Sequence, residues 1–587
     1  MTRLRAYLLT FLSLLHVTTG AAAGACGAPA TAMHQVQGSG ASSPLTGQQV
    51  TVEGILTQDS RHPGGFGGFY LQQADTETDR DPATSEALFI YTRLNKGKPG
   101  QRLRLTGTVK EYHGLTELVE VRKLKVCGEG TLPQPIEVSL PWSQPPESLE
   151  NMRVRFAGPL TVIDHYNLAV FGELTLAASD QVSPTEYLLP GPEARQTSQR
   201  NQQHRVFLDD GKSVRNPDPV PWPPAGLEHP HTVRAGDTIT RLEGVLDFRF
   251  GQWRIQPDRQ PHFKRANARP APPAKPPGHS YRIMTLNLEN YFNGDGQGGG
   301  FPTARGAQSL EAFQRQNQRL VAAVLQTDPD ILAVSEMEND GYGPSSALAE
   351  LTGELGAAWA YIDTPGQDGS DAIRNALLYR SDRVTPVGDA NRPDTRRFQP
   401  LERPPIAQRF QLPGSDQTVR IVVPHLKSKS CRNARAENAD QNDGQGCFNH
   451  RRTQSAKAIL AWLDTLPQPD TLTGTLVTGD LNSYAMEDPM QIFYNAGYTS
   501  LVHHFHPCDA DRCDQHSYRY RGEKGSLDYA LATDDLLPHV INAQSWNINA
   551  DEPRALSYDQ PAGESVRGPW RSSDHNPVIT DLSIPSR

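Results

Sequence analysis

Hydrophobic runs in the second half of the chain end, one after another, in an acid, an amide or a histidine. Residues 331–334 lead to Glu336, residues 475–478 lead to Asp480, and a third run leads to His425. Strands that end in this way can place their polar side chains together at one edge of a sheet. The chain is therefore constrained to a fold whose sheets bring these strand ends close to one another.

The same half of the chain alternates between strand and helix patterns. Apolar residues recur at helical spacing over residues 309–325, and a further helical segment covers about 453–464. Strands separated by helices predict a layered α/β domain, which we place at residues 280–587.

The first half of the chain shows strand alternation, β-branched residues and glycine turns. These patterns predict a small antiparallel barrel at residues 26–135, which resembles an OB-fold, and a second β-rich domain at residues 136–260. Residues of about 190–232 are polar and rich in proline, and predict a long excursion from that second domain. A Pro-rich, semi-rigid linker is expected at residues 261–279.

The N-terminus carries the pattern of an export signal. Two arginines precede an apolar stretch at residues 6–17, and the small residues 21–23 provide a cleavage site. We expect residues 1–25 to be a signal peptide and the mature protein to be secreted, without a membrane span. A lipid anchor on Cys26 is the alternative, although the aliphatic residue expected three positions earlier is missing.

Six cysteines are an even number in a chain expected to be exported, which favours disulfides. Proximity along the chain predicts the pairs Cys431–Cys447, Cys508–Cys513 and, by what remains, Cys26–Cys127. Zinc is the competing use of the region around Cys508, because several histidines surround it, but the spacing fits no standard zinc finger.

The formal net charge of −9 gives no support for a chain-wide nucleic-acid surface, which is usually basic. Charge therefore has to be considered locally. Residues 425–457 contain seven Lys and Arg residues against three acids. This positive excess beside His425 suits a polyphosphate backbone, with Lys427 as a candidate substrate contact. A solvated basic loop held by a disulfide is the plainer interpretation.

The acids and amides at the strand ends suit a hard divalent cation, which prefers oxygen ligands and keeps waters for its substrate. The candidate metal ligands are Asn287, Glu289, Glu336, Asp480, Asn482 and Asp574. Asp480 and Asn482 are also candidate catalytic residues, since one can hold metal or water while the other contacts the phosphoryl group. His575 is a candidate base, and Asp528 is the natural acid to orient it. His425 would be a second imidazole that protonates the leaving oxygen or stabilises the transition-state charge.

These residues fall in six motifs, TLNLEN, SEME, VPHLKS, GDLNS, SLDYAL and SDHNP. In this order they resemble the endonuclease/exonuclease/phosphatase superfamily, which includes DNase I, over about residues 281–585. The resemblance implies a multidomain chain in which OB-like all-β modules precede an α/β DNase I-like four-layer β-sandwich. It implies a divalent metal, Mg²⁺ first, with Mn²⁺ or Ca²⁺ as alternatives. It also implies that Arg403 grips substrate phosphate and that Asp371 supports the first histidine.

Within that superfamily we expect a secreted endonuclease acting on DNA, with RNA as a second substrate left open. The basic segment and the OB-like module favour this hypothesis, as does a nearly full-length resemblance to the exported bacterial ExeM/NucH-type nucleases. The resemblance also implies 5′-phosphate products. A sphingomyelinase-like phosphodiesterase or a phosphatase is the alternative within the superfamily, and a non-catalytic nucleic-acid-binding or adhesive surface protein is the alternative outside it. The sequence indicates no obligate protein partner.

Overall fold

The computed structural model describes residues 24–224, 226–278, 280–412 and 414–584. The predicted export signal lies almost entirely outside these described residues. The chain divides into two compact units. The first comprises Met1–Ile136, Gln144–Val154 and Val245–Gly251, and the second comprises Glu137–Ser143, Arg155–Gly244 and Gln252–Arg587.

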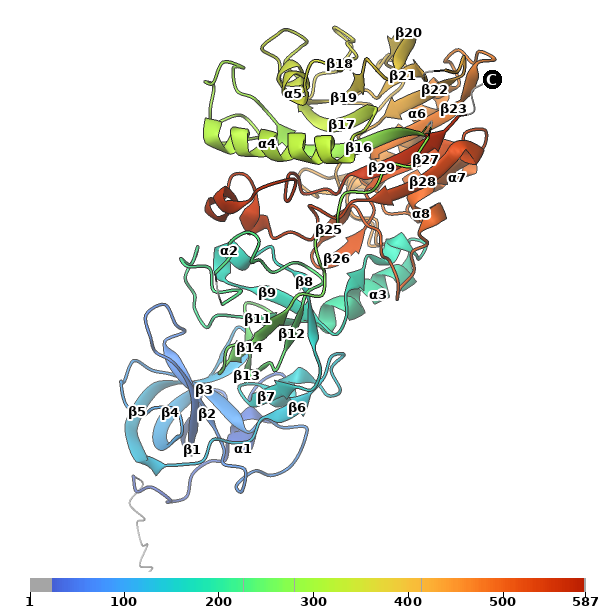
Figure 1. The fold of residues 1–587 in the computed structure, drawn as a ribbon. Helices are drawn as coiled ribbons and strands as arrows, with labels where there is room; N and C mark the ends of the chain where they lie inside the picture. The colour runs from blue at the N-terminus through green and yellow to red at the C-terminus, as the bar shows by residue number, and fades with distance from the viewer. Residues whose placement is uncertain (1–23, 225, 279, 413, 585–587) are drawn as a thin grey trace, which may run out of the picture. The chain divides into compact units, whose positions relative to one another are not determined.

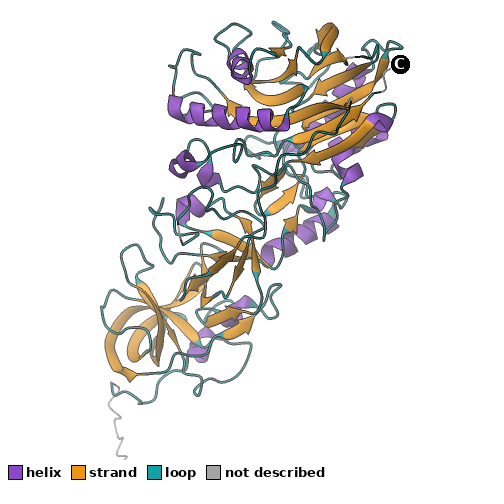
Figure 2. Cartoon of the chain, viewed as in Figure 1, coloured by secondary structure: helices purple, strands orange, loops and turns teal. Residues whose placement is uncertain are grey.

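The first unit contains a closed barrel of five strands in the order β1-β2-β3-β5-β4. The strands are β1 (Gln49–Ser60), β2 (Gly68–Gln72), β3 (Ala87–Tyr91), β4 (Gln101–Tyr112) and β5 (Leu115–Glu129), and the helix α1 is Met33–Gln37. Figure 2 shows that strands dominate this part of the chain. Alternating side chains such as Val52 and Leu105 fill the barrel. Gly54 is required there, because a Cβ would lie 2.4 Å from Cε of Met33 and 2.7 Å from the carbonyl oxygen of Gln72.

The second unit begins with a β-rich region whose strands follow the order β15-β12-β8-β9-β11-β14. They are β8 (Leu160–Asp164), β9 (Leu174–Ala177), β11 (Val206–Leu208), β12 (Thr238–Thr240), β14 (Gln252–Pro257) and β15 (His262–Lys264). Helices α2 (Leu168–Phe171) and α3 (Pro192–Gln203) lie between them in the chain. The excursion expected at 190–232 is thus wrong in its first part, since α3 and β11 fall inside it. Proline opens α3, where its missing N–H costs nothing.

Further strands of this part of the chain are β6 (Ile136–Val138), β7 (Arg153–Phe156), β10 (Gln181–Val182) and β13 (Glu243–Arg249). Short 3₁₀ turns are η1 (Pro146–Leu149), η2 (Pro184–Glu186), η3 (Ala436–Asn438), η4 (Leu537–His539), η5 (Arg554–Leu556) and η6 (Pro561–Ser565). The strand β10 pairs in parallel with β26 (Glu523–Gly525), which pairs with β25 (Tyr518–Tyr520).

The Pro-rich segment that follows is held by ion pairs. Arg269 donates to Glu552 at 2.7 and 2.8 Å, and Nζ of Lys275 lies 2.8 Å from Asp330. The described part of this segment therefore lies along the sandwich that follows it instead of acting as a free spacer.

Two six-stranded sheets form that sandwich, in the orders β18-β19-β17-β16-β29-β28 and β20-β21-β22-β23-β27-β24. The first contains β16 (Ser280–Tyr291), β17 (Ile331–Glu338), β18 (Trp359–Tyr361), β19 (Ile373–Arg380), β28 (Val540–Ser545) and β29 (Val578–Ser583). The second contains β20 (Thr385–Asn391), β21 (Ile406–Gln411), β22 (Thr418–Val423), β23 (Leu472–Asp480), β24 (Tyr498–Ser500) and β27 (Asp528–Thr533).

Helices cover the outer faces of both sheets (Figure 1). They are α4 (Leu310–Thr327) and α5 (Ala347–Leu355) on the first sheet, and α6 (Asn449–Leu463) and α7 (Asp488–Asn495) on the second, with the short α8 (Leu501–Phe505) next to β28. Leu320 of α4 packs in one core with Val334, and Ile459 of α6 packs in another with Val477. A third core, which includes Ile283, fills the space between the sheets. The arrangement is the expected four-layer sandwich.

Three disulfides are present, and each is a pair that the sequence predicts. They join Cys26 to Cys127, Cys431 to Cys447 and Cys508 to Cys513. The sulfurs of Cys508 and Cys513 are therefore not thiolates that could hold zinc. Within the described ranges, no helix reaches the combination of length and apolar character that crossing a bilayer requires.

Candidate active site

Two strands of the first sheet are distorted where they reach the site. The register between β16 and β17 shifts after Asn287, and that between β17 and β19 shifts after Val334. Glu289 and Glu336 follow these points with left-handed backbone, at φ values of 55° and 61°. Side chains other than glycine rarely adopt this conformation, and local bulges of this kind redirect side chains near active sites.

His575 is held from two sides. Its Nδ1 lies 2.6 Å from Oδ2 of Asp528, and its ring packs on Tyr518 with the centroids 4.5 Å apart. Burial opposes a charge on the imidazole, but the charges of Asp528 and Asp574 outweigh it and raise the pKa of His575 well above its usual range. The structure thus brings together the base and the orienting acid that the sequence predicts.

Asp480 is the centre of a second set of contacts. Its Oδ2 accepts from Nδ2 of Asn287 at 3.1 Å, and its Oδ1 accepts from the backbone N–H of Asn482 at 2.8 Å. The Nε2 atom of His425 lies 3.4 Å from Oδ2 of Asp480. Burial, and then the charge of Asp528, raises the pKa of Asp480 to about 7. Asp480, Asp528 and His575 offer ligand atoms within 4.8 Å of one another, so the two sets form one site.

Glu336 and Asp574 form the acidic side of the site. Burial and then the charge of Asp574 raise the pKa of Glu336, whose Oε2 accepts from the backbone N–H of Asn290 at 2.9 Å. Buried carboxylates crowded together are costly unless positive charge offsets them. With the amide of Asn287 beside them, these oxygen donors fit a hard divalent cation.

Glu289, a predicted metal ligand, has an arginine as its partner in the structure. Both of its carboxylate oxygens bind the guanidinium of Arg571, at 2.8 and 3.1 Å. Burial raises the pKa of Glu289 to about 7 even though Arg571 acts in the opposite direction. The pair with Arg571 thus offsets only part of the burial of Glu289, which lies near enough to Asp574 for their charges to interact.

Arg403 lies against His425 and not in an open position. Its NH1 atom is 3.1 and 3.0 Å from the two ring nitrogens, and its NH2 donates to the carbonyl of Leu426 at 2.7 Å. Burial and then the charge of Arg403 hold the pKa of His425 well below its usual range. A neutral His425 is a poor proton donor to a leaving oxygen, so the geometry favours the other predicted role, stabilisation of charge.

Asp371 does not contact the histidine that it was expected to support. Its Oδ1 lies 3.0 Å from NH1 of Arg305, and its Oδ2 lies 4.0 Å from Nε of Arg403. Any support that Asp371 gives to His425 therefore passes through Arg403.

The basic segment after His425 shows less positive charge at the surface than its sequence suggests. Nζ of Lys429 lies 2.5 Å from Glu487, and buried Arg452 donates to backbone carbonyls. Lys427, a predicted substrate contact, lies 3.7 Å from Glu402 with about a third of its side chain exposed. Because an exposed ion pair is weak, Lys427 can still exchange that partner for a phosphate.

Two serines that the sequence analysis missed tie the loops of the site together. The hydroxyl oxygen of Ser517 accepts from the N–H groups of Leu527 and Asp528, both at 2.9 Å. Ser573 donates to the carbonyl of Asn287 at 2.6 Å and accepts from the N–H of His575 at 3.1 Å. Ser573 is inside the SDHNP motif, which is a usable signal, whereas no motif marks Ser517.

A glutamate outside the sandwich holds two of these loops. Oε1 of Glu186 lies 2.9 Å from Nε2 of His503 and accepts from the N–H of Ser526 at 3.1 Å, while Oε2 accepts from the N–H of Ala485 at 3.2 Å. Ser526 lies two residues before Asp528. Burial alone would raise the pKa of Glu186, but the bonds with His503 and Ser526 lower it.

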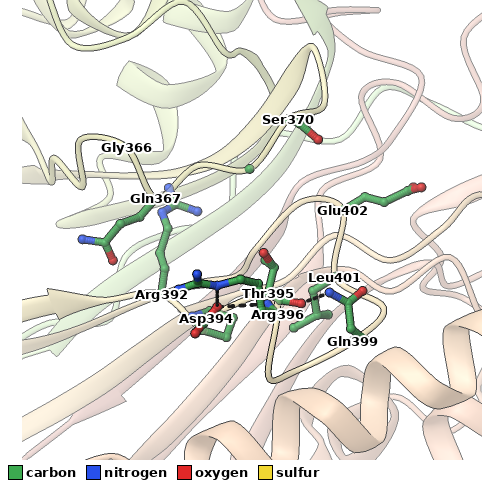
Figure 3. A pocket seen from close by; sticks show the side chains of 12 residues that line it. Gly366, Gln367, Ser370, Arg392, Asp394, Thr395, Arg396, Gln399, Leu401 and Glu402 are labelled. Carbon is green, nitrogen blue, oxygen red and sulfur yellow. Dashed lines mark hydrogen bonds and ion pairs between the residues drawn. The ribbon is translucent and has the colours of Figure 1, made fainter.

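A polar hollow of about 760 Å³ lies between the loops at residues 366–370 and 392–402 (Figure 3). Arg392 is buried in its wall and pairs with Asp368 at 2.8 Å. Glu402 also lines the hollow and directly precedes Arg403 in the chain. The hollow therefore adjoins the segment of the chain that carries Arg403.

Comparison with curated proteins found no match to this chain. Residues 146–267 match a domain of unknown function, DUF8508, and residues 284–575 match the Endonuclease/Exonuclease/phosphatase family.

Solved structures that resemble the chain cover about half of it. The human Nocturnin catalytic domain with bound sulfate shares 18% identity at a TM-score of 0.34, covering 52% of this chain and 94% of that one. D. rerio TDP2 complexed with a single strand DNA product shares 13% at 0.33, covering 52% and 99%. A Bacteroides thetaiotaomicron mannosyl-6-phosphatase shares 16% at 0.35, covering 52% and 100%.

These likenesses are too low to assign a substrate. The match at residues 284–575 contains all of the candidate catalytic and metal-binding residues described above. This segment is therefore a domain of the Endonuclease/Exonuclease/phosphatase family, whose members hydrolyse phosphoester bonds.

Proposed function

We propose that the family domain is a metal-dependent endonuclease that hydrolyses phosphodiester bonds of DNA, with RNA as a second substrate. The observation that carries the proposal is the Asp528–His575 pair next to Asp480, at the same site as the acids Glu336 and Asp574. An imidazole that can activate water thus lies beside carboxylates that can hold a cation, which is what phosphoester hydrolysis requires.

With a cation in the site to offset the acid charges that raise the pKa of His575, the imidazole would be neutral and would take the proton of the attacking water. Because Asp528 occupies Nδ1, the other ring nitrogen is the one that exchanges the proton, and the carboxylate stabilises the imidazolium that forms. On the opposite side, neutral His425 accepts a hydrogen bond from Arg403 at one ring nitrogen and keeps an N–H at the other. That N–H and the Arg403 charge stabilise the charge that develops on the phosphoryl oxygens and the leaving group.

Glu336, Asp574 and Asn287 would hold the metal, with Asp480 and Asn482 beside them. We expect Mg²⁺, with Mn²⁺ or Ca²⁺ as alternatives, because all of these donors are oxygens. When bound, the ion polarises the scissile phosphate. Glu289, the remaining candidate ligand, pairs with Arg571 on this side of the site.

The N-terminal barrel supports a nucleic-acid substrate. Its five strands close in the order β1-β2-β3-β5-β4, and we infer that it is an OB-like module. Such barrels bind single-stranded nucleic acid on their strands and loops. Arg432 and Arg435, which are exposed after His425, add positive charge on the catalytic domain.

We also propose that the protein is exported and acts outside the cell, as the exported ExeM/NucH-type nucleases do. The three disulfides support this, since disulfides persist in oxidising compartments.

The proposal is tested by offering plasmid DNA, RNA and sphingomyelin to the purified protein, with EDTA or with Mg²⁺, Mn²⁺ or Ca²⁺. We expect metal-dependent cleavage of DNA that is lost in His575→Ala and in Glu336→Ala. Leu325→Ala, on the exposed face of α4, is the control for handling and folding. Cleavage of sphingomyelin without nucleic acid, or full activity in either site variant, would contradict the proposal.

A further inference from the structure

A cleft of about 850 Å³ opens next to the acidic side of the site, inside the second unit. One wall comes from the β-rich region of residues 155–257, through Tyr166 and Phe207. The other comes from the β25–β26 hairpin and the segment at η5, through Tyr520 and Arg554. Asp574 is among the residues that line it. The cleft is therefore formed in part by a residue that the proposed reaction uses.

Aromatic rings stand exposed on both walls. Tyr166 is 58% exposed and Tyr520 is 55% exposed, which is more than is usual for tyrosine side chains. The guanidinium of Arg554 lies 4.6 Å from the ring centre of Tyr166, and that of Arg521 lies 5.3 Å from the ring centre of Tyr520. Each ring thus has a cation beside it, which for Tyr520 comes from the same wall and for Tyr166 from the opposite wall.

Two of the acids that line the cleft pair with arginines behind them. Glu173 binds Arg254 at 2.6 Å, and Glu552 binds Arg234 at 2.8 Å. Arg521 and Arg554 are exposed to solvent. These two arginines are consequently more accessible than the paired carboxylates of Glu173 and Glu552.

The two walls are joined firmly. Arg519, next to Tyr520, binds Asp180 at 2.7 Å and Asp551 at 2.8 Å, which fixes the hairpin to both sides. Tyr518, on the same strand, packs against His575. A ligand bound along the hairpin would therefore reach the catalytic pair without any movement of the walls.

We infer that this cleft holds the single-stranded nucleotides that flank the scissile phosphate, with bases stacked on Tyr166 and Tyr520. Arg521 and Arg554 contact the neighbouring phosphates. The inference rests on the proposed nuclease function and adds that the strand is unpaired where it flanks the scissile phosphate. The volume is that of a small-molecule pocket, roughly 300–1,000 Å³, which suits a few stacked nucleotides of one strand. Aromatic rings with adjacent cations are the usual platform for such strands, because every base has a stacking face.

Location is tested by photocrosslinking. The full-length His575→Ala protein, which should not consume its substrate, is irradiated with a short single-stranded DNA carrying 5-iodouracil, and the crosslinked peptides are identified by mass spectrometry. We expect crosslinks at Tyr166 or Tyr520. Crosslinks confined to other parts of the chain, or none at all, would overturn the inference whatever the protein cleaves.

Energetics are tested by kinetics on two substrates. Tyr166→Ala and Tyr520→Ala should each raise KM for a single-stranded oligonucleotide by roughly 5- to 100-fold more than for bis(p-nitrophenyl) phosphate, which is too small to reach both rings. Tyr166→Phe and Tyr520→Phe keep the ring and should remain close to wild type. Equal effects on the two substrates would overturn the cleft assignment, whereas a wild-type protein that hydrolyses neither substrate would overturn the proposed function.

Discussion

Oδ2 of Asp528 lies 2.6 Å from Nδ1 of His575, although the two residues are 47 positions apart. Asp528 is also the direct cross-strand neighbour of Asp480, at the end where β23 and β27 pair. Two carboxylates therefore share one sheet end, and each meets a different imidazole, because Asp480 faces His425. Asp528 can therefore orient His575, while Asp480 lies with the groups proposed to contact the phosphate and the metal.

Asp528→Asn should lower kcat for DNA cleavage by about 10²- to 10⁴-fold, the range for loss of general base catalysis. The amide can still bond the imidazole, but it removes the charge that stabilises the imidazolium and can favour the wrong tautomer. KM should change little, because Asp528 is buried behind the ring. Steady-state cleavage of a labelled oligonucleotide over a range of concentrations measures both parameters.

The matched control for that substitution is Asp535→Asn, which changes an exposed acid beyond the end of the same strand. It should retain wild-type kinetics. Retention of wild-type kcat in Asp528→Asn would mean that His575 does not depend on this acid.

Glu336 and Glu289 should respond differently to loss of charge. Glu336→Gln removes a proposed ligand and should abolish metal-dependent cleavage. Glu289→Gln disturbs the Arg571 pair behind the ligands, and should raise the half-saturating metal concentration by about 10- to 100-fold. Metal titrations of activity, together with calorimetry of Mn²⁺ binding, separate the two effects. The reverse order of severity would place Glu289 among the ligands.

Much of the site could be predicted from the sequence because strand ends share an edge. The acids, amides and histidines follow hydrophobic runs, and parallel or antiparallel pairing then forces them together, as for Asp480 and Asp528. The short Cys508–Cys513 spacing likewise left little choice of partner. In such cases local sequence and topology determine the neighbour.

The remainder depends on contacts that no local pattern encodes. Glu289, which has left-handed backbone, meets Arg571 across 282 residues. The charge of Lys429 is offset by an ion pair with buried Glu487, which the composition cannot reveal. Glu186 lies in a different part of the chain from the loops that it supports, so the sequence gives no reason to connect them.

Removal of the Cys431–Cys447 disulfide should destabilise the catalytic domain by about 3 kcal/mol, the loop-closure value for a span of this size. The bridge closes a loop with a sequence separation of 16, and Cys447 is buried. Urea unfolding of Cys431→Ser/Cys447→Ser measures the loss. The Cys508→Ser/Cys513→Ser variant opens a span of only 5 and should lose less. A larger loss in the second variant would show that native contacts, and not loop length, decide the stability.

Glu186→Gln should lower the free energy of unfolding at neutral pH by about 1–3 kcal/mol, because a carboxylate that accepts from buried donors is replaced by an amide that also donates. The pKa of Glu186 is depressed below 4.5 in the folded protein. Its contribution is therefore fully present above that value and is lost as pH falls through the folded pKa. The stability difference between wild type and variant should accordingly shrink on acidification, which urea titrations on both sides of pH 4.5 would reveal.

The same substitution should lower kcat more than it raises KM, since Glu186 holds the loop that leads to Asp528 and lies away from bound substrate. Glu193→Gln, on the exposed first turn of α3, is the matched control and should change neither stability nor kinetics. A pH-independent loss of stability with unchanged kcat would reduce Glu186 to a packing residue. If the loss of kcat in Glu186→Gln instead has the same pH dependence as its loss of stability, the β-rich region positions the catalytic loops.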